Sequence, residues 1–395
     1  MKLSLRIFVL AFVLIISVPF FGRLALRGTT PGMVLETENR QVTAFSPLTS
    51  WRRGKMKEWF RNNDLWIADR LAKKDFVVRT ANAFLADPKY FYSMDFSRGL
   101  YGQEGFLFLG NNYARVLDRH LSPAFSLSYE TRERLLNQHI ALQRVAHEQK
   151  ATYVLFAAPD KHGIFCEKLP SFLTGKNACR KTSRVTRDLQ KDFEKKGVSL
   201  VYPFDEVRHE NAHTIYFKAD THWKMTGAEV GFFALMDHLT NRGLRFSGKT
   251  FASTKGVNYR LETTPLGQTG DLRTIIGVPN DYVISDTGVR FVSTVPVRFS
   301  ELDKPRISMP AQKVAIYGWK ARWKGTVINS SAPNKARVLI FCDSFMTAMS
   351  PFFFSHFQDT HFFSYYGRSQ KELEQAVRDV KPDLVVFETV ERALY

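Results

Sequence analysis

The sequence predicts an α/β domain in which a mostly parallel sheet is covered by helices on both faces. Short apolar runs of strand length alternate with longer amphipathic segments of helix length from about residue 101 onward. This alternation is typical of strand–helix–strand units, whose sheet is buried on both sides. One stretch, 282–299, alternates apolar and polar residues and predicts an antiparallel β insertion. Functional groups gather at the carboxyl ends of parallel strands, so the residues that follow each strand are the first candidates for a site.

The predicted elements follow one another in a regular order. Helix 129–150 leads into a buried strand at 153–158, and helix 183–196, ended by Gly197, leads into a short strand at 198–202. The later elements are a helix opened by a capping box of Thr226 and Glu229, a buried strand at 338–342, a helix capped by Ser369 and Glu372, and a last strand at 384–387.

The N-terminal residues predict export. Lys2 and Arg6 precede an uncharged apolar run, Ile7 to Phe21, and no clean small-residue cleavage site follows it. The run fits a secretory signal and reaches membrane-spanning length if it extends to Leu26. We therefore expect three parts, which are an uncleaved signal anchor over 1–28, a basic helical stalk over 29–95 and an exported domain over 96–395.

Composition and charge narrow the functional classes. The 395 residues include 56 Lys+Arg and 38 Asp+Glu, a formal net charge of +18. Such a charge suits nucleic acid, anionic lipid or an anionic polymer, but export, interspersed acids and the lack of an aromatic-basic binding motif argue against nucleic acid. Three cysteines are too few for a disulfide framework or a four-cysteine metal site.

The buried strand at 338–342 runs directly into Asp343-Ser344-Phe345. A serine on the turn between a buried strand and a helix is where an esterase-like fold exposes its nucleophile. A serine in that position also commonly caps the helix, so this motif alone leaves both interpretations open.

A second candidate is the segment Asp220-Thr221-His222-Trp223. Asp220 and His222 are two positions apart in an extended segment and therefore point to the same side. A carboxylate so placed can hold the imidazole tautomer and stabilise its cation, as a Ser-His-Asp triad requires. The alternatives are a surface histidine and a metal pair with His209 and His213. The spacing matches no strong zinc pattern, so we expect no metal.

Several motifs occur together in one order along the chain. They are Tyr101-Gly102-Gln103-Glu104-Gly105-Phe106-Leu107-Phe108, Ala158-Pro159-Asp160-Lys161-His162, Asp220 to Trp223, Gly270-Asp271-Leu272, Asp343-Ser344-Phe345, and Pro382-Asp383 leading to Glu388, Glu391 and Arg392. With them the chain resembles, over roughly Trp51 to Tyr395, the bacterial polysaccharide O-acetyltransferases of the alginate type (the AlgJ and AlgX proteins), a branch of the SGNH-hydrolase-like superfamily. The Asp-x-His-Trp segment lies upstream of the serine, which is a permuted order relative to ordinary SGNH esterases.

The resemblance implies an SGNH-hydrolase-like (flavodoxin-like) fold and an O-acetyltransferase that acts on an exported polysaccharide, whether alginate, cellulose or another exopolysaccharide. It implies a catalytic triad of Ser344, His222 and Asp220 with an acetyl-serine intermediate, in a periplasmic domain anchored to the inner membrane. No phosphate-cradling Gly-rich loop for a CoA-type cofactor is present, so we expect no cofactor. The resemblance implies instead a multi-spanning membrane acyltransferase as the acetyl donor. A carbohydrate acetylesterase or deacetylase and a non-catalytic polysaccharide-binding scaffold remain as alternatives.

Further residues are predicted around the triad. Asn329 and Gly270 are candidates for a second oxyanion donor beside the backbone N–H of Ser344. Trp223 and the segment Phe352 to Phe354 are expected near the serine, where they would shape the acceptor cleft. Core packing is the alternative, and the favoured one for the phenylalanines.

The three cysteines are predicted to have two different fates. Cys166 and Cys179 share one loop segment after the strand at 153–158, in a compartment that oxidises thiols, and are expected to form a disulfide. Cys342 ends a buried strand beside the serine and is expected to remain a free, packed thiol.

Overall fold

The structure is a computed structural model that describes residues 34–35, 40–41 and most of 97–394. Within the last range it leaves out 171–172, 175–178, 180–181, 211, 243–244, 247–248, 251–252, 268, 279–282, 296, 302–306 and 310–323. The predicted signal anchor over 1–28, and the stalk over 29–95 apart from two residue pairs, lie outside the described residues. In the part of the chain that is described, no helix is both long and apolar enough to cross a membrane.

The chain forms two compact units, one of residues 1–95 with 271–283 and one of residues 96–270 with 284–395. The described elements of the first unit are a strand pair, β1 (Val34–Leu35) with β2 (Arg40–Gln41), and helix α11 (Asp271–Ile276). The second unit, called the main unit below, contains all three predicted triad residues.

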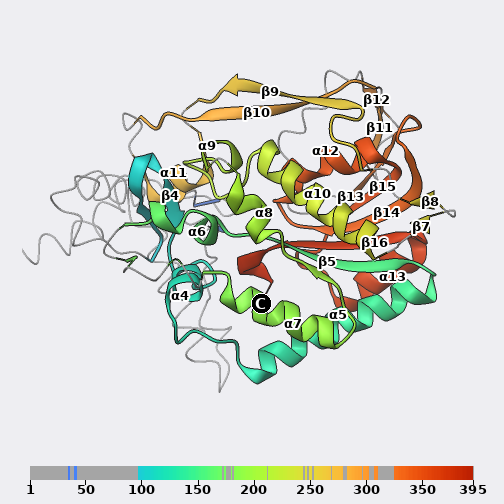
Figure 1. Ribbon diagram of the computed structural model, residues 1–395, viewed down its shortest axis with the longest axis horizontal. Helices are drawn as coiled ribbons and strands as arrows, with labels where there is room; N and C mark the ends of the chain where they lie inside the picture. The colour runs from blue at the N-terminus through green and yellow to red at the C-terminus, as the bar shows by residue number, and fades with distance from the viewer. Residues whose placement is uncertain are drawn as a thin grey trace, which may run out of the picture. The chain divides into compact units, whose positions relative to one another are not determined.

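An eight-stranded sheet organises the main unit (Figure 1), with the strand order β12-β11-β13-β15-β14-β16-β5-β6. From β15 to β6 all neighbouring strands are parallel, and β13, β11 and β12 extend the β15 edge in antiparallel pairs. The sheet is therefore mostly parallel, as predicted. The strands are β5 (Thr152–Ala158), β6 (Leu200–Val201), β11 (Val297–Glu301), β12 (Ile307–Met309), β13 (Lys324–Ile328), β14 (Asn334–Cys342), β15 (Phe357–Ser364) and β16 (Leu384–Val390).

Helices cover the two faces of this sheet. One face carries α5 (Tyr129–Glu148), α7 (Arg184–Lys195) and α13 (Gln370–Val380), and the other carries α8 (Phe204–His209), α10 (Met225–Asn241) and α12 (Met346–His356), as Figure 1 shows. The central strands β14 and β16 are almost entirely buried between the two layers. Shorter helices are α4 (Val116–Leu121), α6 (Lys161–Ile164) and α9 (Ala212–Ile215).

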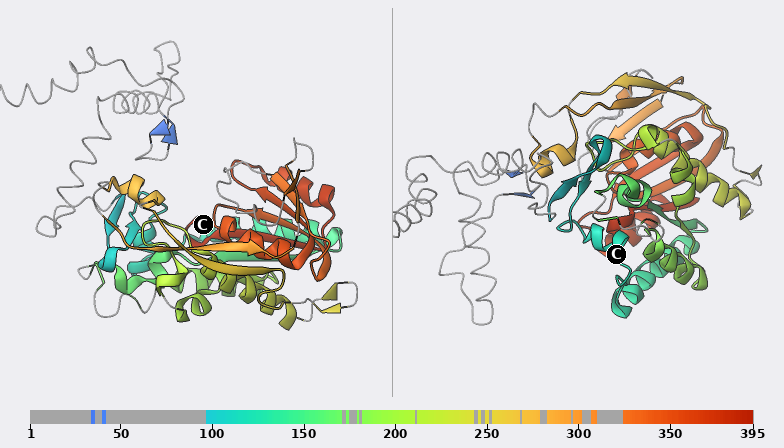
Figure 2. Two further views of the ribbon diagram at one scale, coloured as in Figure 1. Left: turned by 90° about the horizontal axis from the view of Figure 1, so that it is seen from above. Right: turned by 60° about the vertical axis from the view of Figure 1, so that its left-hand side comes forward.

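The predicted β insertion consists of two separate ladders. Strand β10 (Thr287–Ser293) pairs antiparallel with β9 (Tyr259–Pro265), and the next strand, β11, joins the main sheet. The β9–β10 hairpin runs beside α10 and α12 (Figures 1 and 2), and its Tyr259 and Phe291 rings pack edge-on against Phe352 at centroid distances of 5.2 and 5.5 Å. Two further hairpins are β3 (Gly99–Tyr101) with β4 (Leu107–Leu109), and β7 (Arg245–Phe246) with β8 (Lys249–Thr250).

One of the two predicted capping boxes is present. The Ser369 side chain accepts from the backbone N–H of Glu372, and the Glu372 side chain accepts from that of Ser369, at the start of α13. The box of Thr226 and Glu229 is wrong, because Lys224 precedes α10 without a side-chain cap. Tertiary partners compete for both side chains. Thr226 donates to the carbonyl of Thr214, and Glu229 accepts from the hydroxyl of Tyr259.

The predicted fates of the cysteines are confirmed. Cys166 and Cys179 form a disulfide with their Cα atoms 5.4 Å apart, and Cys342 is a free, buried thiol. Burial raises the pKa of Cys342 well above its ordinary value.

Replacing Cys166 and Cys179 by Ala is expected to lower the free energy of unfolding by about 3 kcal/mol, because the bridge restricts a short loop in the unfolded chain. Urea unfolding of the single and double variants measures this. Each single variant should lose nearly as much as the double variant, since both residues act through one bond. Losses that simply add would show that the two side chains stabilise the protein by something other than a shared bridge.

Candidate active site

Ser344 lies on the turn between β14 and α12, at the carboxyl edge of the parallel strands, and is exposed. The turn is held by Asp343, whose Oδ1 accepts from the N–H of Phe345 at 2.8 Å and whose Oδ2 accepts from the N–H of Val390 at 2.7 Å. The carboxyl of Glu388 in turn accepts from the N–H of Asp343 at 3.1 Å. Two buried acids at the ends of β14 and β16 therefore fix the backbone that presents the serine.

Burial shifts the protonation of both acids. Burial raises the pKa of Glu388 well above its ordinary value, and the negative charge of the neighbouring Asp343 adds to the rise. Burial also raises the pKa of Asp343, although the backbone N–H groups of Val390 and Phe345 oppose the rise. Both raised pKa values reduce the tendency to place two negative charges together in the core.

The predicted triad residues converge in one line. His222 Nε2 lies 2.7 Å from Ser344 Oγ, although the two residues are 122 positions apart in the sequence. His222 Nδ1 lies 2.6 Å from Asp220 Oδ1, which also accepts from the backbone N–H of His222 at 2.9 Å. The carboxylate fixes the proton on Nδ1, and Nε2 is then the acceptor that faces the serine hydroxyl.

A tight loop presents the dyad. Tyr216 and Trp223 form an antiparallel bridge, and the N–H of Phe217 donates to the carbonyl of His222 at 3.3 Å. Trp223 is 1% exposed, and its Nε1 donates to the carbonyl of Phe345 at 2.9 Å. The indole thus connects the segment that carries His222 to the segment that carries Ser344. It lies near the serine as predicted, but it is buried and offers no face on which an acceptor sugar could stack, and a role in shaping the cleft stays a prediction.

Phe352 to Phe354 are fully buried on α12, so the favoured alternative of core packing is confirmed for them. Asn329 is wrongly predicted as an oxyanion donor. Its N–H donates to the carbonyl of Gln358, and its side-chain amide donates to the carbonyl of Phe354 at 2.8 Å. It therefore lies at the amino end of β14, and the nine-residue strand separates it from Ser344 by roughly 30 Å at about 3.3 Å per residue.

Gly270 lies against the residue that precedes Asp220. Its φ is +133°, and a Cβ atom added there would come within 2.2 Å of the carbonyl oxygen of Ala219. Only glycine fits this close approach. The predicted oxyanion role of Gly270 stays a prediction.

Three residues near the site were not predicted to contribute to it. Tyr366 follows β15, and Lys161 and Arg392 follow β5 and β16, so all three come after parallel strands. Lys161 and Arg392 had appeared only as parts of motifs, without a role. The signal that marks them is the one that marked Ser344, since polar or aromatic residues directly after buried strands meet at one edge of the sheet.

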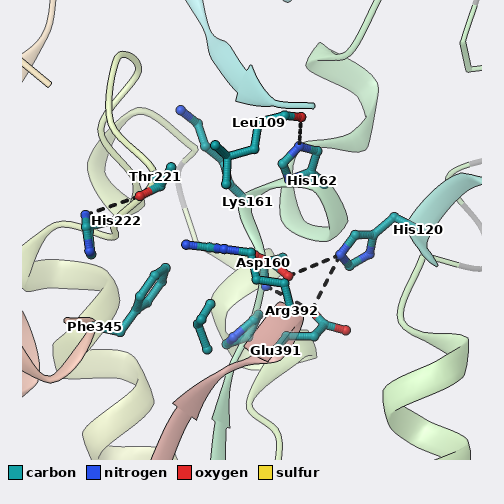
Figure 3. Close-up of polar contacts among 12 residues, drawn as sticks. Leu109, His120, Asp160, Lys161, His162, Thr221, His222, Phe345, Glu391 and Arg392 are labelled. Atoms are coloured by element: carbon teal, nitrogen blue, oxygen red, sulfur yellow. Dashed lines mark hydrogen bonds and ion pairs between the residues drawn. The ribbon is translucent and has the colours of Figure 1, made fainter. Parts of the chain in front are cut away.

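A buried ion cluster lies at the same edge (Figure 3). Arg392 Nη1 lies 2.5 Å from Asp160 Oδ1, and His120 Nε2 lies 3.5 Å from Asp160 Oδ2 and 4.0 Å from Glu391 Oε2. Burial alone would lower the pKa of His120, but the two carboxylates outweigh it and raise the pKa. Burial would raise the pKa of Asp160, but Arg392 and His120 hold it below its ordinary value.

His120, Asp160 and Glu391 carry ligand atoms close enough together to hold a cation. Their oxygens are already taken, however. Glu391 Oε1 accepts from the hydroxyls of Thr186 and Tyr202 at 2.6 and 2.7 Å, and Asp160 holds Arg392. Because Arg392 and His120 already face these carboxylates and two hydroxyls occupy Glu391 Oε1, the cluster does not fit a metal.

The chain is similar in sequence to one protein family and in fold to several solved structures. The family model "SGNH hydrolase-like domain, acetyltransferase AlgX" matches residues 100–305. No curated protein matches the chain. Among solved structures, Bacillus cereus PatB1 is 18% identical with a TM-score of 0.54, over 75% of this chain and 96% of that chain. The O-acetyltransferase domain of Pseudomonas putida AlgJ is 16% identical with a TM-score of 0.45, over 75% and 92%. At this identity the likeness to PatB1 shows the fold.

Proposed function

Because the chain belongs to the AlgX family of SGNH hydrolase-like acetyltransferase domains, we propose that it carries an acetyl group on Ser344 and passes it to hydroxyls of an exported polysaccharide. The observation that supports this most strongly is the line of Ser344, His222 and Asp220 with contacts of 2.7 and 2.6 Å. Capping or core packing would not require residues 122 positions apart to meet in this way.

In the first half-reaction, His222 Nε2 accepts the proton of Ser344 as the serine oxygen attacks the acetyl carbonyl of the donor. A bond from Oγ to the acetyl carbon forms, the bond from that carbon to the donor breaks, and the imidazolium returns its proton to the leaving group. Asp220 keeps the Nδ1–H in place and stabilises the transient cation. The backbone N–H of Ser344 is the first candidate donor to the oxyanion.

In the second half-reaction, His222 Nε2 accepts the proton of a sugar hydroxyl as the sugar oxygen attacks the acetyl-serine carbonyl. The bond from the acetyl carbon to Ser344 Oγ breaks, and the imidazolium returns the proton to Oγ. Water in place of the sugar would give an acetylesterase from the same groups, so the binding of the acceptor decides the reaction class. The further parts of this proposal are a periplasmic site, attachment to the inner membrane and a multi-spanning membrane acyltransferase as the acetyl donor.

A direct test supplies the protein with an activated acetyl ester and candidate oligosaccharides. We expect the mass of one acetyl group on the peptide that contains Ser344, and its movement to the sugar when the acceptor is added. Release of free acetate at the same rate with and without sugar would favour the esterase. A complete lack of acyl-serine together with retained polymer binding would favour the non-catalytic scaffold.

Tyr366 is the aromatic side chain best placed to bind an acceptor sugar. Ser364 of β15 pairs with Cys342 of β14, so the turns that carry Tyr366 and Ser344 are neighbours. Tyr366 is 43% exposed, and its ring centroid lies 4.8 Å from that of Tyr365. Burial raises the pKa of the Tyr366 phenol well above its ordinary value, and the nearby Asp343 carboxylate adds to the rise, so the phenol stays neutral. A neutral, half-exposed ring beside the nucleophile suits stacking on a sugar.

Replacing Tyr366 by Ala is expected to raise the KM for the acceptor about tenfold, the equivalent of roughly 1.4 kcal/mol of lost stacking. Tyr366→Phe should retain most of the binding. Steady-state kinetics with varied acceptor measures this, while the burst of acyl-serine formation from an acetyl ester stays unchanged. Tyr129→Ala, at a 74% exposed tyrosine at the start of α5, is the control. An unchanged acceptor KM in Tyr366→Ala would contradict the assignment.

A further inference from the structure

Lys161 is a buried lysine whose charge the reaction as described does not use. It follows the end of β5, begins α6 and is 2% exposed. Its Nζ donates to three backbone carbonyls, those of Leu107 at 2.8 Å, Lys218 at 2.7 Å and Asp220 at 3.0 Å. An ammonium group has three donors, so each N–H of the buried cation has an oxygen partner.

The surroundings of this ammonium hold it in one place. Phe106 and Phe108, beside and within the β3–β4 hairpin, place their ring centroids 5.5 and 5.4 Å from Nζ. Aromatic faces attract a cation more strongly when water is excluded. Figure 3 shows the Lys161 side chain directed toward the side of the view on which Thr221 and His222 lie.

Two of the three carbonyls belong to the segment that presents the base. Lys161 Nζ holds the backbone carbonyl oxygen of Asp220 from the buried side of the segment. Asp286 braces the segment on both sides of the dyad, since its Oδ2 accepts from the N–H of Lys218 at 2.7 Å and its Oδ1 from Nζ of Lys224 at 2.6 Å. Lys161 therefore contacts directly the backbone of the residue whose carboxylate orients His222.

We propose that Lys161 is a positioning residue for acetyl transfer, whose buried ammonium fixes the Asp220 carbonyl and thereby aims the Asp220 carboxylate at His222 Nδ1. This inference rests on the proposed function of the triad. Removal of the ammonium takes one donor from each of the three carbonyl oxygens, and of these the Lys218 oxygen keeps the backbone N–H of Leu107, so the segment at Asp220 relaxes toward water. The 2.6 Å contact between the carboxylate and the imidazole is then lost.

Replacing Lys161 by Met keeps an unbranched side chain, shorter by one atom, and removes its charge. We expect kcat for acyl transfer from an activated acetyl ester to fall about 100-fold, since displacement of a catalytic group by about 1 Å costs that much. The KM for the ester should change little, because Lys161 does not reach the bound donor. Lys191→Met, at a 71% exposed lysine on α7, is the matched control and should leave both constants unchanged.

A double-mutant cycle with Asp220→Asn isolates the proposed route. If Lys161 acts through Asp220, Lys161→Met should cost less than about threefold in the Asp220→Asn background. An undiminished loss in that background overturns the proposal. If Lys161→Met does not fold, Lys161→Arg takes its place. Its planar guanidinium retains the charge but fits three converging carbonyls poorly, so a smaller loss that again vanishes with Asp220→Asn is expected.

Failure of this inference is distinguishable from failure of the proposed function. If Ser344→Ala retains acetyl transfer, the proposed triad is wrong, whatever the effect of replacing Lys161. If transfer depends on Ser344 but the losses of kcat in Lys161→Met and Asp220→Asn multiply, the triad is supported and Lys161 does not act through Asp220.

Discussion

Replacing Ser344 by Ala is expected to reduce acetyl transfer by about four to six orders of magnitude, because the covalent route is lost with the attacking oxygen. The fold should survive. Ser344 is exposed, and its hydroxyl lies 2.7 Å from His222 Nε2, so its replacement removes little packing. Acyl-serine detection by mass spectrometry and release of acetyl groups from the donor measure the loss.

The control for this experiment is Ser369→Ala, at the serine that caps α13. That change should cost about 1 kcal/mol of stability and leave acetyl transfer unchanged, the reverse of the result at Ser344. Asp220→Asn should cost less than Ser344→Ala, since the carboxylate orients the base without forming bonds to the substrate. Transfer within tenfold of the wild type in Ser344→Ala would remove the nucleophile, and with it the acyl-enzyme mechanism.

The sequence carries enough local information to predict the sheet and the triad. Buried strands read as continuous apolar runs, and Asp343-Ser344 directly follows one of them. Asp220 and His222 are two positions apart, so a single local pattern was enough to pair them. The family resemblance supplied the remaining link between two segments 122 positions apart, and the SGNH-hydrolase-like fold it implied is confirmed.

The surroundings of three residues could not be predicted from the sequence, because tertiary contacts determine them. Trp223 reads as a cleft residue because it adjoins the base, yet its Nε1 has a partner in the carbonyl of Phe345, which only the fold brings near. Asn329 precedes strand β14 and Ser344 follows it, so the two residues lie at opposite ends of that strand. Closeness in the sequence therefore gave a wrong prediction of closeness in space. Lys161 gave no signal of its role, because its three partners are backbone carbonyls and any residue type can supply them.

Replacing Asp160 by Asn is expected to lower the free energy of unfolding by about 3 to 5 kcal/mol, because it leaves buried positive charge without its partner. Arg392 Nη1 lies 2.5 Å from Asp160, and the Arg392 guanidinium also lies 5.3 Å from the ring centroid of Phe345, next to the nucleophile. Asparagine keeps the shape of the side chain, so the change tests charge and not volume. Urea unfolding measures the loss, and Asp192→Asn, which breaks a partly exposed pair with Arg132, is the control and should cost at most about 1 kcal/mol.

The pH dependence of that loss gives the sharper test. The pKa of His120 is raised in the folded protein, so its contribution is complete below about pH 6.5 and is lost as the pH rises through the folded-state pKa. The pKa of Asp160 is lowered, so its contribution is present above about pH 4 and is lost only as the pH falls through the lower value. The cost of Asp160→Asn should therefore be largest between about pH 4.5 and 6.5 and should fall as the pH rises through the folded-state pKa of His120, above which only the pair with Arg392 remains. A cost that grows toward pH 9 would mean that His120 is neutral in the folded protein and that the cluster is an arginine–carboxylate pair alone.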